Sequence, residues 1–427
     1  MKFQNLLSIL SGFASLSGFA SLSDLAQPIQ QMQPIQQMQP IQQMQPIQQM
    51  QPIQQMQPIQ QMQPIQQIQT NFDYFLGNFN INLDSNDKSE YEFRKRIWET
   101  EVSRIENHNA KFAQNNVYWT EELNHMSIMT SKEKDAFAGY HKGVKKNFKP
   151  THQIAFDKTL IMESVDKLPK FVDWSIVSGL TTAVKDQGQC GSCWAFASTA
   201  VIESHVAINT GKLFDLSPQQ IASCAPNPEQ CGGSGNCQGA TAELAFDYVA
   251  SISTDKSGLT EEFQTPYLSY YGVEQSCNAI KSVPKAKISG YVKLPENNYT
   301  ALMNAVAKIG PIAISVDASN WHSYTTGIFN GCNQVNPDID HAVVLMGYGE
   351  DNVTGNKYWL VRNSWSASWG ENGYIRILRL DNDESNCGMD IEPSDGTACA
   401  GDTEPQKVCG TCGILFDSAY PVGATFY

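Results

Sequence analysis

The sequence predicts an α+β fold of two lobes, a helical lobe followed by a lobe rich in strands, with a separate helical segment in front of them. The 427 residues leave room for two or three folded units. A long helical pattern at 192–209 closes at Gly211, and shorter helical patterns follow at 217–224 and 240–251. Helices first and strands later favour an α+β arrangement. The strand patterns, separated by Gly, Pro and Asn, are 287–293, 312–317, 341–347, 358–362 and 373–380.

Residues 1–23 are predicted to be a secretory signal peptide. Lys2 precedes a mainly apolar stretch, Leu6 to Leu22, and small residues follow it. A short membrane anchor is the alternative, but the stretch is too short and too polar for a full span, and no later segment approaches one. We therefore expect the protein in the secretory pathway, bound for a lysosome or vacuole or for the extracellular space. The final compartment is not predicted.

Residues 24–83 are predicted to be a disordered extension. Within it, Pro-Ile-Gln-Gln-Met-Gln recurs every six residues, with seven starts from Pro28 to Pro64. A proline every sixth residue interrupts any helix and removes ladder donors from a strand, and the repeats carry no charge. A Gln/Met-rich assembly tract is the alternative, and the role of the repeats is not predicted.

Residues 84–150 are predicted to form a helical domain, and 151–167 a linker. The helical pattern rests on six residues spaced 4, 4, 3, 4 and 4 apart, which stack on one helix face. Alone, this pattern is typical of an ordinary amphipathic helix. The six residues are Glu90, Arg94, Trp98, Glu101, Ile105 and Asn109.

Charge and cysteine content narrow the function. The chain has 43 acidic and 29 basic side chains, a net charge of −14, which argues against nucleic acid and anionic membrane as partners. All 11 cysteines lie between Cys190 and Cys412, which suggests an oxidising compartment. An odd number leaves one thiol free to react.

Cys193 has the surroundings of a reactive thiol. It lies in Gln187-Gly-Gln-Cys-Gly-Ser-Cys193-Trp-Ala-Phe196, where a Gly/Ser turn gives way to a helix. Backbone amides and the dipole at a helix N-terminus favour the thiolate. Such a nucleophile needs a base nearby and a group that orients the base.

His341 is the predicted partner of Cys193. Four of the seven histidines precede the cysteine-rich region, which leaves His205, His322 and His341. His205 falls more than three turns along the helix that Cys193 begins, too far to reach it. His341 opens an apolar strand, where a lone histidine is more often a satisfied core residue. The next strand ends at Asn363, whose amide can orient an imidazole, and Trp365 follows to shield that bond from water.

Taken together, these segments resemble the papain family of cysteine peptidases, closest to its cathepsin L-like branch. The resemblance covers about 171–426 as the enzyme and, more loosely, 86–150 as an inhibitory propeptide. It implies a helical lobe and an antiparallel β-barrel lobe within 168–427, preceded by a helical propeptide. It also implies a cysteine endopeptidase made as a zymogen.

The resemblance implies a role for each site residue. Cys193 as thiolate attacks the peptide carbonyl beside protonated His341, which then protonates the leaving amine. Asn363 orients His341. The side-chain amide of Gln187 and the backbone N–H of Cys193 stabilise the oxyanion. A plain turn residue is the alternative for Gln187.

In the precursor, the stacked residues from Glu90 to Asn109 resemble the helix motif of cathepsin L-type inhibitory propeptides, with Trp98 and Glu101 as departures. The resemblance implies that this region fills the cleft in cis until it is cleaved near Leu168. Activation at acidic pH is a hypothesis.

Four residues are expected to contact substrate: Gly239, Ala240, Trp365 and Asp417. The family has a second glycine where this chain has Ala240, so the backbone contact to substrate becomes more crowded. Asp417 falls at the floor of the specificity pocket, where it would favour Arg or Lys two residues before the scissile bond. A solvated surface aspartate is the alternative.

The resemblance also implies three disulfides, Cys190–Cys237, Cys224–Cys277 and Cys332–Cys412, with Cys387 as the other candidate partner of Cys332. The stretch 387–409 is then an insertion. Two further bridges would join Cys231, Cys387, Cys399 and Cys409, in pairs that are not predicted.

Two other functions compete with an endopeptidase. A catalytically dead homologue would usually lose the nucleophile or the histidine, and both are present. An exopeptidase needs an element that blocks the cleft, for which the insertion 387–409 is a candidate. We expect a monomer that acts on proteins and peptides, without cofactor or metal. Asn298 and Asn352 begin glycosylation sequons.

Overall fold

The structure is a computed structural model that describes residues 69–84, 87–114, 117–139, 150–159, 162–277, 283–399 and 401–427. All of them belong to one compact unit, Gln61–Tyr427. The predicted signal peptide and the hexapeptide repeats lie outside the described residues, so those predictions stay untested.

A helix lies in front of the segment 84–150 that was predicted to be the inhibitory propeptide. Residues 72–78 form helix α2 (Phe72–Asn78), so the predicted disorder is wrong for the end of the 24–83 extension. The proline repeat stops before this point and aromatic residues take over. Phe72 and Phe75 are buried, with ring centroids 5.5 and 6.2 Å from that of Trp98 on helix α3 (Lys88–Ala113). Burial of these rings fixes α2 against α3.

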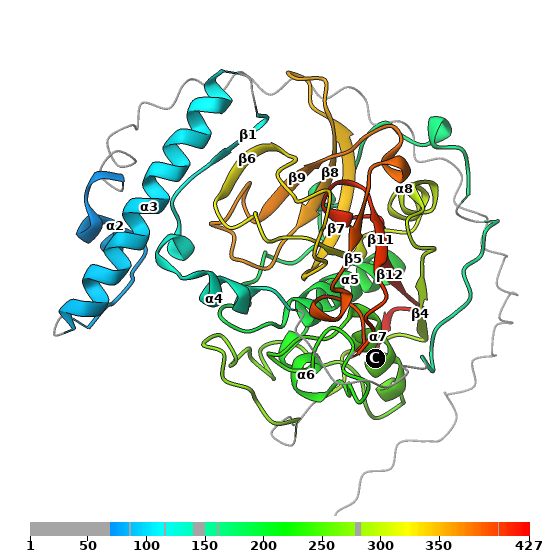
Figure 1. Cartoon of the computed structure of the whole chain (residues 1–427). Coiled ribbons are helices and arrows are strands. Elements are labelled where there is room, and N and C mark those ends of the chain that lie inside the picture. The colour runs from blue at the N-terminus through cyan, green and yellow to red at the C-terminus, as the bar shows by residue number, and fades with distance from the viewer. Residues whose placement is uncertain are drawn as a thin grey trace, which may run out of the picture. The chain divides into compact units, whose positions relative to one another are not determined.

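After α3, the propeptide continues as strand β1 (Trp119–Glu121) and helix α4 (Ser131–Lys134). β1 pairs antiparallel with β6 (Tyr324–Phe329) of the strand lobe, as Figure 1 shows. Further along, Gln153 bridges to Tyr291 of β4 (Gly290–Lys293). Short 3-10 helices are 125–128, 135–137, 165–167, 174–176, 383–385, 393–395 and 411–413.

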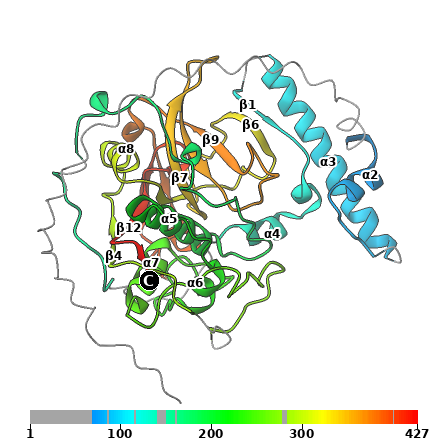
Figure 2. The same ribbon diagram turned by 180° about the vertical axis from the view of Figure 1, so that it is seen from behind.

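The helical lobe matches the predicted helices. It contains α5 (Cys193–Thr210), α6 (Pro218–Cys224) and α7 (Ala242–Ile252). Gly211 ends α5 in a left-handed conformation with φ of 70°, which glycine adopts without a side-chain clash. The apolar residues of α5 share one core with Ala342, Val344 and Met346, and Figure 2 shows this helix beside β7.

The strand lobe is built on one sheet, whose order is β1-β6-β9-β8-β7-β5-β12-β4. The pairs along it are antiparallel except β6 with β9. Its remaining strands are β5 (Ile312–Val316), β7 (His341–Glu350), β8 (Lys357–Arg362), β9 (Tyr374–Leu378) and β12 (Asp417–Val422). Beside it lie α8 (Tyr299–Lys308), β2 (Val172–Asp173), which pairs with β7, and the small pair β3 (Ala286–Lys287) and β13 (Thr425–Phe426).

The expected closed β-barrel is wrong for the part of the chain that the structure describes, because the end strands β1 and β4 do not pair with each other. Unpaired sheet edges are normally covered or closed. Here the propeptide strand β1 covers the edge that β6 would otherwise expose, and Gln153 makes a single bridge to Tyr291 of β4 at the other end. The α+β class and the two lobes are confirmed.

The insertion 387–409 forms a hairpin of β10 (Cys387–Asp390) and β11 (Gln406–Cys409). The three disulfides that the resemblance implied are present. The structure supplies the two pairs that were not predicted, Cys231–Cys399 and Cys387–Cys409.

Candidate active site

Cys193 is the first residue of α5, at the end of the helix that exposes backbone N–H groups. It is buried, and it is free among the described residues, which include all eleven cysteines. The disulfide from Cys190 to Cys237 holds the turn in front of it. Its Sγ accepts a hydrogen bond from the backbone N–H of Ala342 at 3.3 Å, which sets it beside the start of β7.

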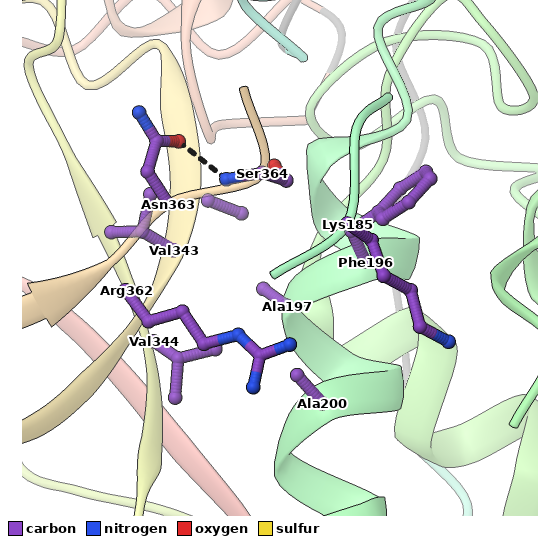
Figure 3. A pocket seen from close by; sticks show the side chains of 10 residues that line it. Lys185, Phe196, Ala197, Ala200, Val343, Val344, Arg362, Asn363 and Ser364 are labelled. Carbon is purple, nitrogen blue, oxygen red and sulfur yellow. Dashed lines mark hydrogen bonds between the residues drawn. The ribbon is translucent and has the colours of Figure 1, made fainter. Parts of the chain in front are cut away.

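His341, the first residue of β7, is joined to Asn363 by a hydrogen bond of 2.8 Å between Nε2 and Oδ1. Antiparallel pairing of β7 with β8 brings Asn363, which follows β8, back to the start of β7. Asn363 Oδ1 also accepts from the N–H of Ser364 at 2.8 Å (Figure 3). The ring of Trp365 packs on His341 with centroids 4.8 Å apart. The structure therefore brings Cys193, His341 and Asn363 together.

Gln187 is held in one orientation by its neighbours. Ser364 Oγ donates to Gln187 Oε1 at 2.7 Å, which leaves Nε2 free to point its two hydrogens elsewhere. Nε2 donates to the carbonyl oxygens of Cys190 and of Phe137, both at 3.0 Å. Phe137 belongs to the propeptide, so a propeptide carbonyl lies on the amide that the sequence analysis assigned to the oxyanion. The sequence analysis gave Ser364 no role.

The propeptide covers the predicted nucleophile. Gly139 donates its backbone N–H to the carbonyl oxygen of Asp340 at 2.9 Å. A Cβ atom added to Gly139 would lie 2.0 Å from Cys193 Sγ, so only a residue without a side chain fits there. A Cβ added to Gly239, whose φ is +90°, would lie 1.7 Å from the carbonyl oxygen of Gly139. The backbone of Gly239 therefore lies directly against the peptide in the cleft.

Burial of the pair in the precursor favours the uncharged forms of both side chains. Burial raises the pKa of the Cys193 thiol to about 12, although the Ala342 N–H opposes this rise. Burial lowers the pKa of His341 to about 4, although the hydrogen bond that its ring makes to Asn363 Oδ1 opposes this fall. Between these values the thiol and the imidazole are both neutral. This differs from the charged pair that the resemblance implies for the active enzyme.

Of the other predicted substrate contacts, Ala240 is buried directly after Gly239, and Trp365 is buried against His341. Asp417 is 4% exposed, so the alternative of a solvated surface aspartate is wrong. Its Oδ2 accepts from Ser315 Oγ at 2.8 Å, and its Oδ1 lies 2.8 Å from Lys293 Nζ. Lys293 was not predicted as part of the site, because no local pattern links it to Asp417.

A small cavity lies behind the site, between α5 and the strands β7 and β8 (Figure 3). Its volume is about 20 Å³, enough for a single water molecule, so it has no room for substrate. Its lining residues are Lys185, Phe196, Ala197, Ala200, Ala342, Val343, Val344, Arg362, Asn363 and Ser364.

Two lobes that meet at a free cysteine and a histidine–asparagine pair, with a propeptide across them, define a cysteine peptidase precursor. Residues 168–397 match the model of the papain family cysteine protease. The chain belongs to the papain family of cysteine proteases.

The relatives agree with this assignment. Procathepsin L of Mus musculus is 35% identical over 70% of this chain and 84% of its own length. Digestive cysteine proteinase 1 of Homarus americanus is 36% identical, over 71% and 87% respectively. Among solved structures, a recombinant stem bromelain precursor matches with a TM-score of 0.63 and 31% identity, covering 83% of this chain and 98% of that one. Digestive procathepsin L2 of Tenebrio molitor matches with a TM-score of 0.65 and 28% identity, covering 83% and 99%.

Within the described ranges, no helix combines the length and the apolar character needed to cross a membrane. The same ranges contain no group of three or more His, Cys, Asp or Glu side chains arranged to hold a metal ion.

Proposed function

We propose that this chain is the zymogen of a cysteine endopeptidase, with Cys193 as nucleophile and His341 as its acid–base partner. One observation carries the proposal: the free thiol of Cys193 lies at a helix N-terminus, hydrogen-bonded to the residue next to His341, whose ring is bonded to Asn363. Nucleophile, base and orienting group thus follow each other in space.

In the proposed reaction, departure of the propeptide lets water reach the site, and the Cys193 proton passes to His341. The thiolate adds to the peptide carbonyl, and His341 gives its proton to the leaving amine as the C–N bond breaks. Water then adds to the thioester while His341 takes one of its protons, and the carboxylic acid leaves as the C–S bond breaks. Asn363 keeps the imidazole in the orientation that both transfers need.

Gln187 is the proposed oxyanion donor, together with the backbone N–H of Cys193. The 3.0 Å hydrogen bond from Gln187 Nε2 to the carbonyl oxygen of Phe137 supports this role, because it is a peptide carbonyl that the amide holds. The bond from Ser364 fixes the amide before substrate arrives, so no reorganisation is needed when charge develops.

The propeptide is the proposed inhibitor, and cleavage near Leu168 the proposed release step. Gly139 lies on Cys193, and both edges of the sheet carry propeptide segments, so inhibition and docking use different parts of the propeptide. We further propose an acidic lysosome-like or secreted compartment, monomeric enzyme, and proteins and peptides as substrates. The net charge of −14 argues against nucleic acid.

Asp417 is the proposed selector of Arg or Lys two residues before the scissile bond. Its burial and its ion pair with Lys293 support a pocket position, and they also mean that a substrate cation joins an existing network instead of meeting a lone carboxylate.

The experiment that tests the proposal is mass spectrometry of acid-treated precursor after labelling with an epoxide that reacts with thiols. A single adduct on Cys193, in a chain trimmed to near Leu168, is the expected result. Cys193→Ala is the control and should give neither adduct nor trimming. An intact, unlabelled precursor at every pH would overturn the proposal in favour of a binding protein.

A second variant tests the partner of Cys193. His341→Ala should lower the rate of labelling roughly 100-fold or more, since general base catalysis of this kind contributes about 100- to 10,000-fold. His205→Ala is the matched control, because His205 on α5 is also buried and hydrogen-bonded, but to the carbonyl oxygen of Pro311 and not to Asn363.

A further inference from the structure

The insertion 387–409 connects the two cores of the enzyme. Its ends, Cys387 and Cys409, pack in the core of the strand lobe, whereas Cys399 in its middle packs against the core of the helical lobe. We call residues 387–409 the strap. His341 and Cys193 lie on the same two lobes, so the strap spans the division that runs through the active site.

Both ends of the span are fixed. At the base, Cys387 and Cys409 form a disulfide across the β10–β11 hairpin, and Met389 donates its N–H to the carbonyl oxygen of Val335 at 3.1 Å. At the tip, Cys399 is bonded to Cys231, and the N–H of Gly232 donates to the carbonyl oxygen of Ala398 at 3.1 Å. The strap therefore cannot swing away from the helical lobe while the tip disulfide is intact.

The strap, both lobes and the propeptide enclose a cavity of about 280 Å³. The strap gives Thr397, Ala398, Cys399, Asp402 and Gln406 to its lining. The lobes give Cys231, Thr241, Glu243, Tyr291, Lys293, Glu296, Phe416 and Asp417. Pro150 and Gln153 of the propeptide complete it, so this side opens when the propeptide leaves.

The charges that line the cavity are unequal. Four carboxylates, those of Glu243, Glu296, Asp402 and Asp417, face one ammonium group. That group, Lys293 Nζ, lies 3.2 Å from Glu243 and 2.8 Å from Asp417, so the two inner carboxylates share one cation. The hydroxyl of Tyr291 is buried and has no hydrogen-bond partner among the described residues.

We propose that the strap is the outer wall of the substrate pocket that contains Asp417, and that its disulfide tether and Asp402 set how strongly this pocket prefers Arg or Lys over Leu. This inference rests on the proposed peptidase function. A guanidinium or ammonium group would join a network in which four acidic side chains share one lysine, and it could donate to the hydroxyl of Tyr291. A leucine side chain would bury these acidic groups further without adding a partner for them, which is costly.

The strap contributes in two ways. Its tether fixes the width of the pocket, because Cys231 lies in the loop that leads to Gly239, whereas Asp417 belongs to the strand lobe. Its Asp402 adds a carboxylate from a third side. The preference for Arg or Lys over Leu should therefore depend on residues of the strap as well as on the pocket residues of the two lobes.

The test compares two peptide substrates that differ only in Arg or Leu at the second residue before the scissile bond. The ratio of their kcat/KM values is measured for the mature enzyme and for Cys231→Ser/Cys399→Ser. We expect the Arg-to-Leu ratio of kcat/KM to be roughly tenfold lower in this double variant, which corresponds to the loss of about one well-placed interaction. Cys224→Ser/Cys277→Ser, which removes a disulfide remote from the cavity, should keep the ratio.

Asp402→Asn leaves the tether disulfide in place, so it provides a second test if the double variant does not fold. This substitution should lower the preference for Arg over Leu about threefold. An unchanged ratio in the tether variant or in Asp402→Asn, or no Arg preference in the wild-type enzyme, overturns the proposal. Alkylation of Cys193 by iodoacetamide, which fills no side-chain pocket, is measured in parallel. Loss of alkylation would refute the peptidase function, whereas a changed ratio with normal alkylation concerns the strap alone.

Discussion

Carboxyl groups in the propeptide and in the strand lobe have pKa values that are shifted in opposite directions. In the propeptide, Arg94 donates to both oxygens of Glu133 at 2.5 Å and lowers the pKa of that carboxyl to about 2. In the strand lobe, burial and the nearby Asp390 raise the pKa of Asp338 to about 7. Burial beside other aspartates likewise holds the pKa of Asp340 well above its usual range.

These opposite shifts give the two regions opposite pH dependence. Glu133 stabilises the fold fully above its unfolded pKa of about 4.5, and that stability is lost as pH falls toward 2. Asp338, with a raised folded pKa, costs nothing below its unfolded pKa of about 3.8 and becomes destabilising as pH rises toward 7. Mild acid therefore strengthens the enzyme before it weakens the Glu133 pair of the propeptide. Acid activation, if it occurs, must begin with another contact.

The largest effect is expected for Arg94→Ala, which removes the cation that lowers the pKa of Glu133. The change removes hydrogen bonds to Glu90, to Glu133 and to the carbonyl oxygen of Ile128, all within the propeptide, and should cost about 2 kcal/mol of the stability of the propeptide fold on which its docking depends. We expect maturation at pH 7 to be roughly 30-fold faster, followed as loss of intact precursor on gels. Arg96→Ala, on the exposed face of the same helix, is the control. Equal rates for the two variants would contradict the role given to Arg94.

In the strand lobe, Asp338→Asn should have the next largest effect. It removes a charge that forms only at higher pH, so the mature enzyme should gain about 1–2 kcal/mol near neutrality and nothing at pH 4. The half-life of activity at pH 7.5 should lengthen about tenfold. Glu404→Gln, an exposed change in the strap, should leave it unaltered. A gain of the same size at both pH values would show that charge is not the cause.

Substrate selectivity offers a smaller test of the same principle. Burial and Asp417 raise the pKa of Glu243 to about 7, so the pocket becomes more negative as pH rises through that value. The Arg-to-Leu ratio of kcat/KM should increase about fivefold from pH 6 to 8, and Glu243→Gln should flatten the profile. The other charged or titratable groups that face the pocket are Tyr291, Lys293, Glu296, Asp402 and Asp417. A flat wild-type profile would count against Glu243.

The smallest effect is expected at the surface pair of Lys357 and Asp381, whose aspartate side chain is 80% exposed. Solvent screens such a pair, so Lys357→Ala should change stability by less than about 0.5 kcal/mol. Thermal unfolding should then move by no more than about 1–2 °C at either pH 4 or pH 7. If Lys357→Ala lowered the unfolding temperature by much more than this, the pair would stabilise the fold despite its exposure, and the prediction would be wrong.

The parts of the molecule that could be predicted from sequence are those with local patterns. The Gly/Ser turn before Cys193, the apolar strand after His341 and the polar end of the next strand each lie within a few residues. The helices were also predictable, because caps and apolar spacing are local. Antiparallel pairing of neighbouring strands then brings His341 and Asn363 together without any long-range information.

The parts that could not be predicted depend on residues far apart in the chain. Lys293 contacts Asp417 across paired strands, and no sequence pattern near either residue predicts this contact. The disulfide between Cys231 and Cys399 could not be predicted either, since four cysteines allow three pairings. The open sheet escaped prediction because a separate segment, the propeptide, supplies its edges.

The span of the tip disulfide has a consequence for biosynthesis. Cys190–Cys237 and Cys224–Cys277 join residues 47 and 53 apart, whereas Cys231–Cys399 joins residues 168 apart. In a chain oxidised as it is synthesised, the two short bridges can close while the C-terminal half is still being made. Cys231, between two cysteines that pair early, must wait as a thiol for a partner that emerges much later. Slow oxidation, or an isomerase that reopens wrong bonds, should therefore decide how much correctly bridged protein a cell obtains.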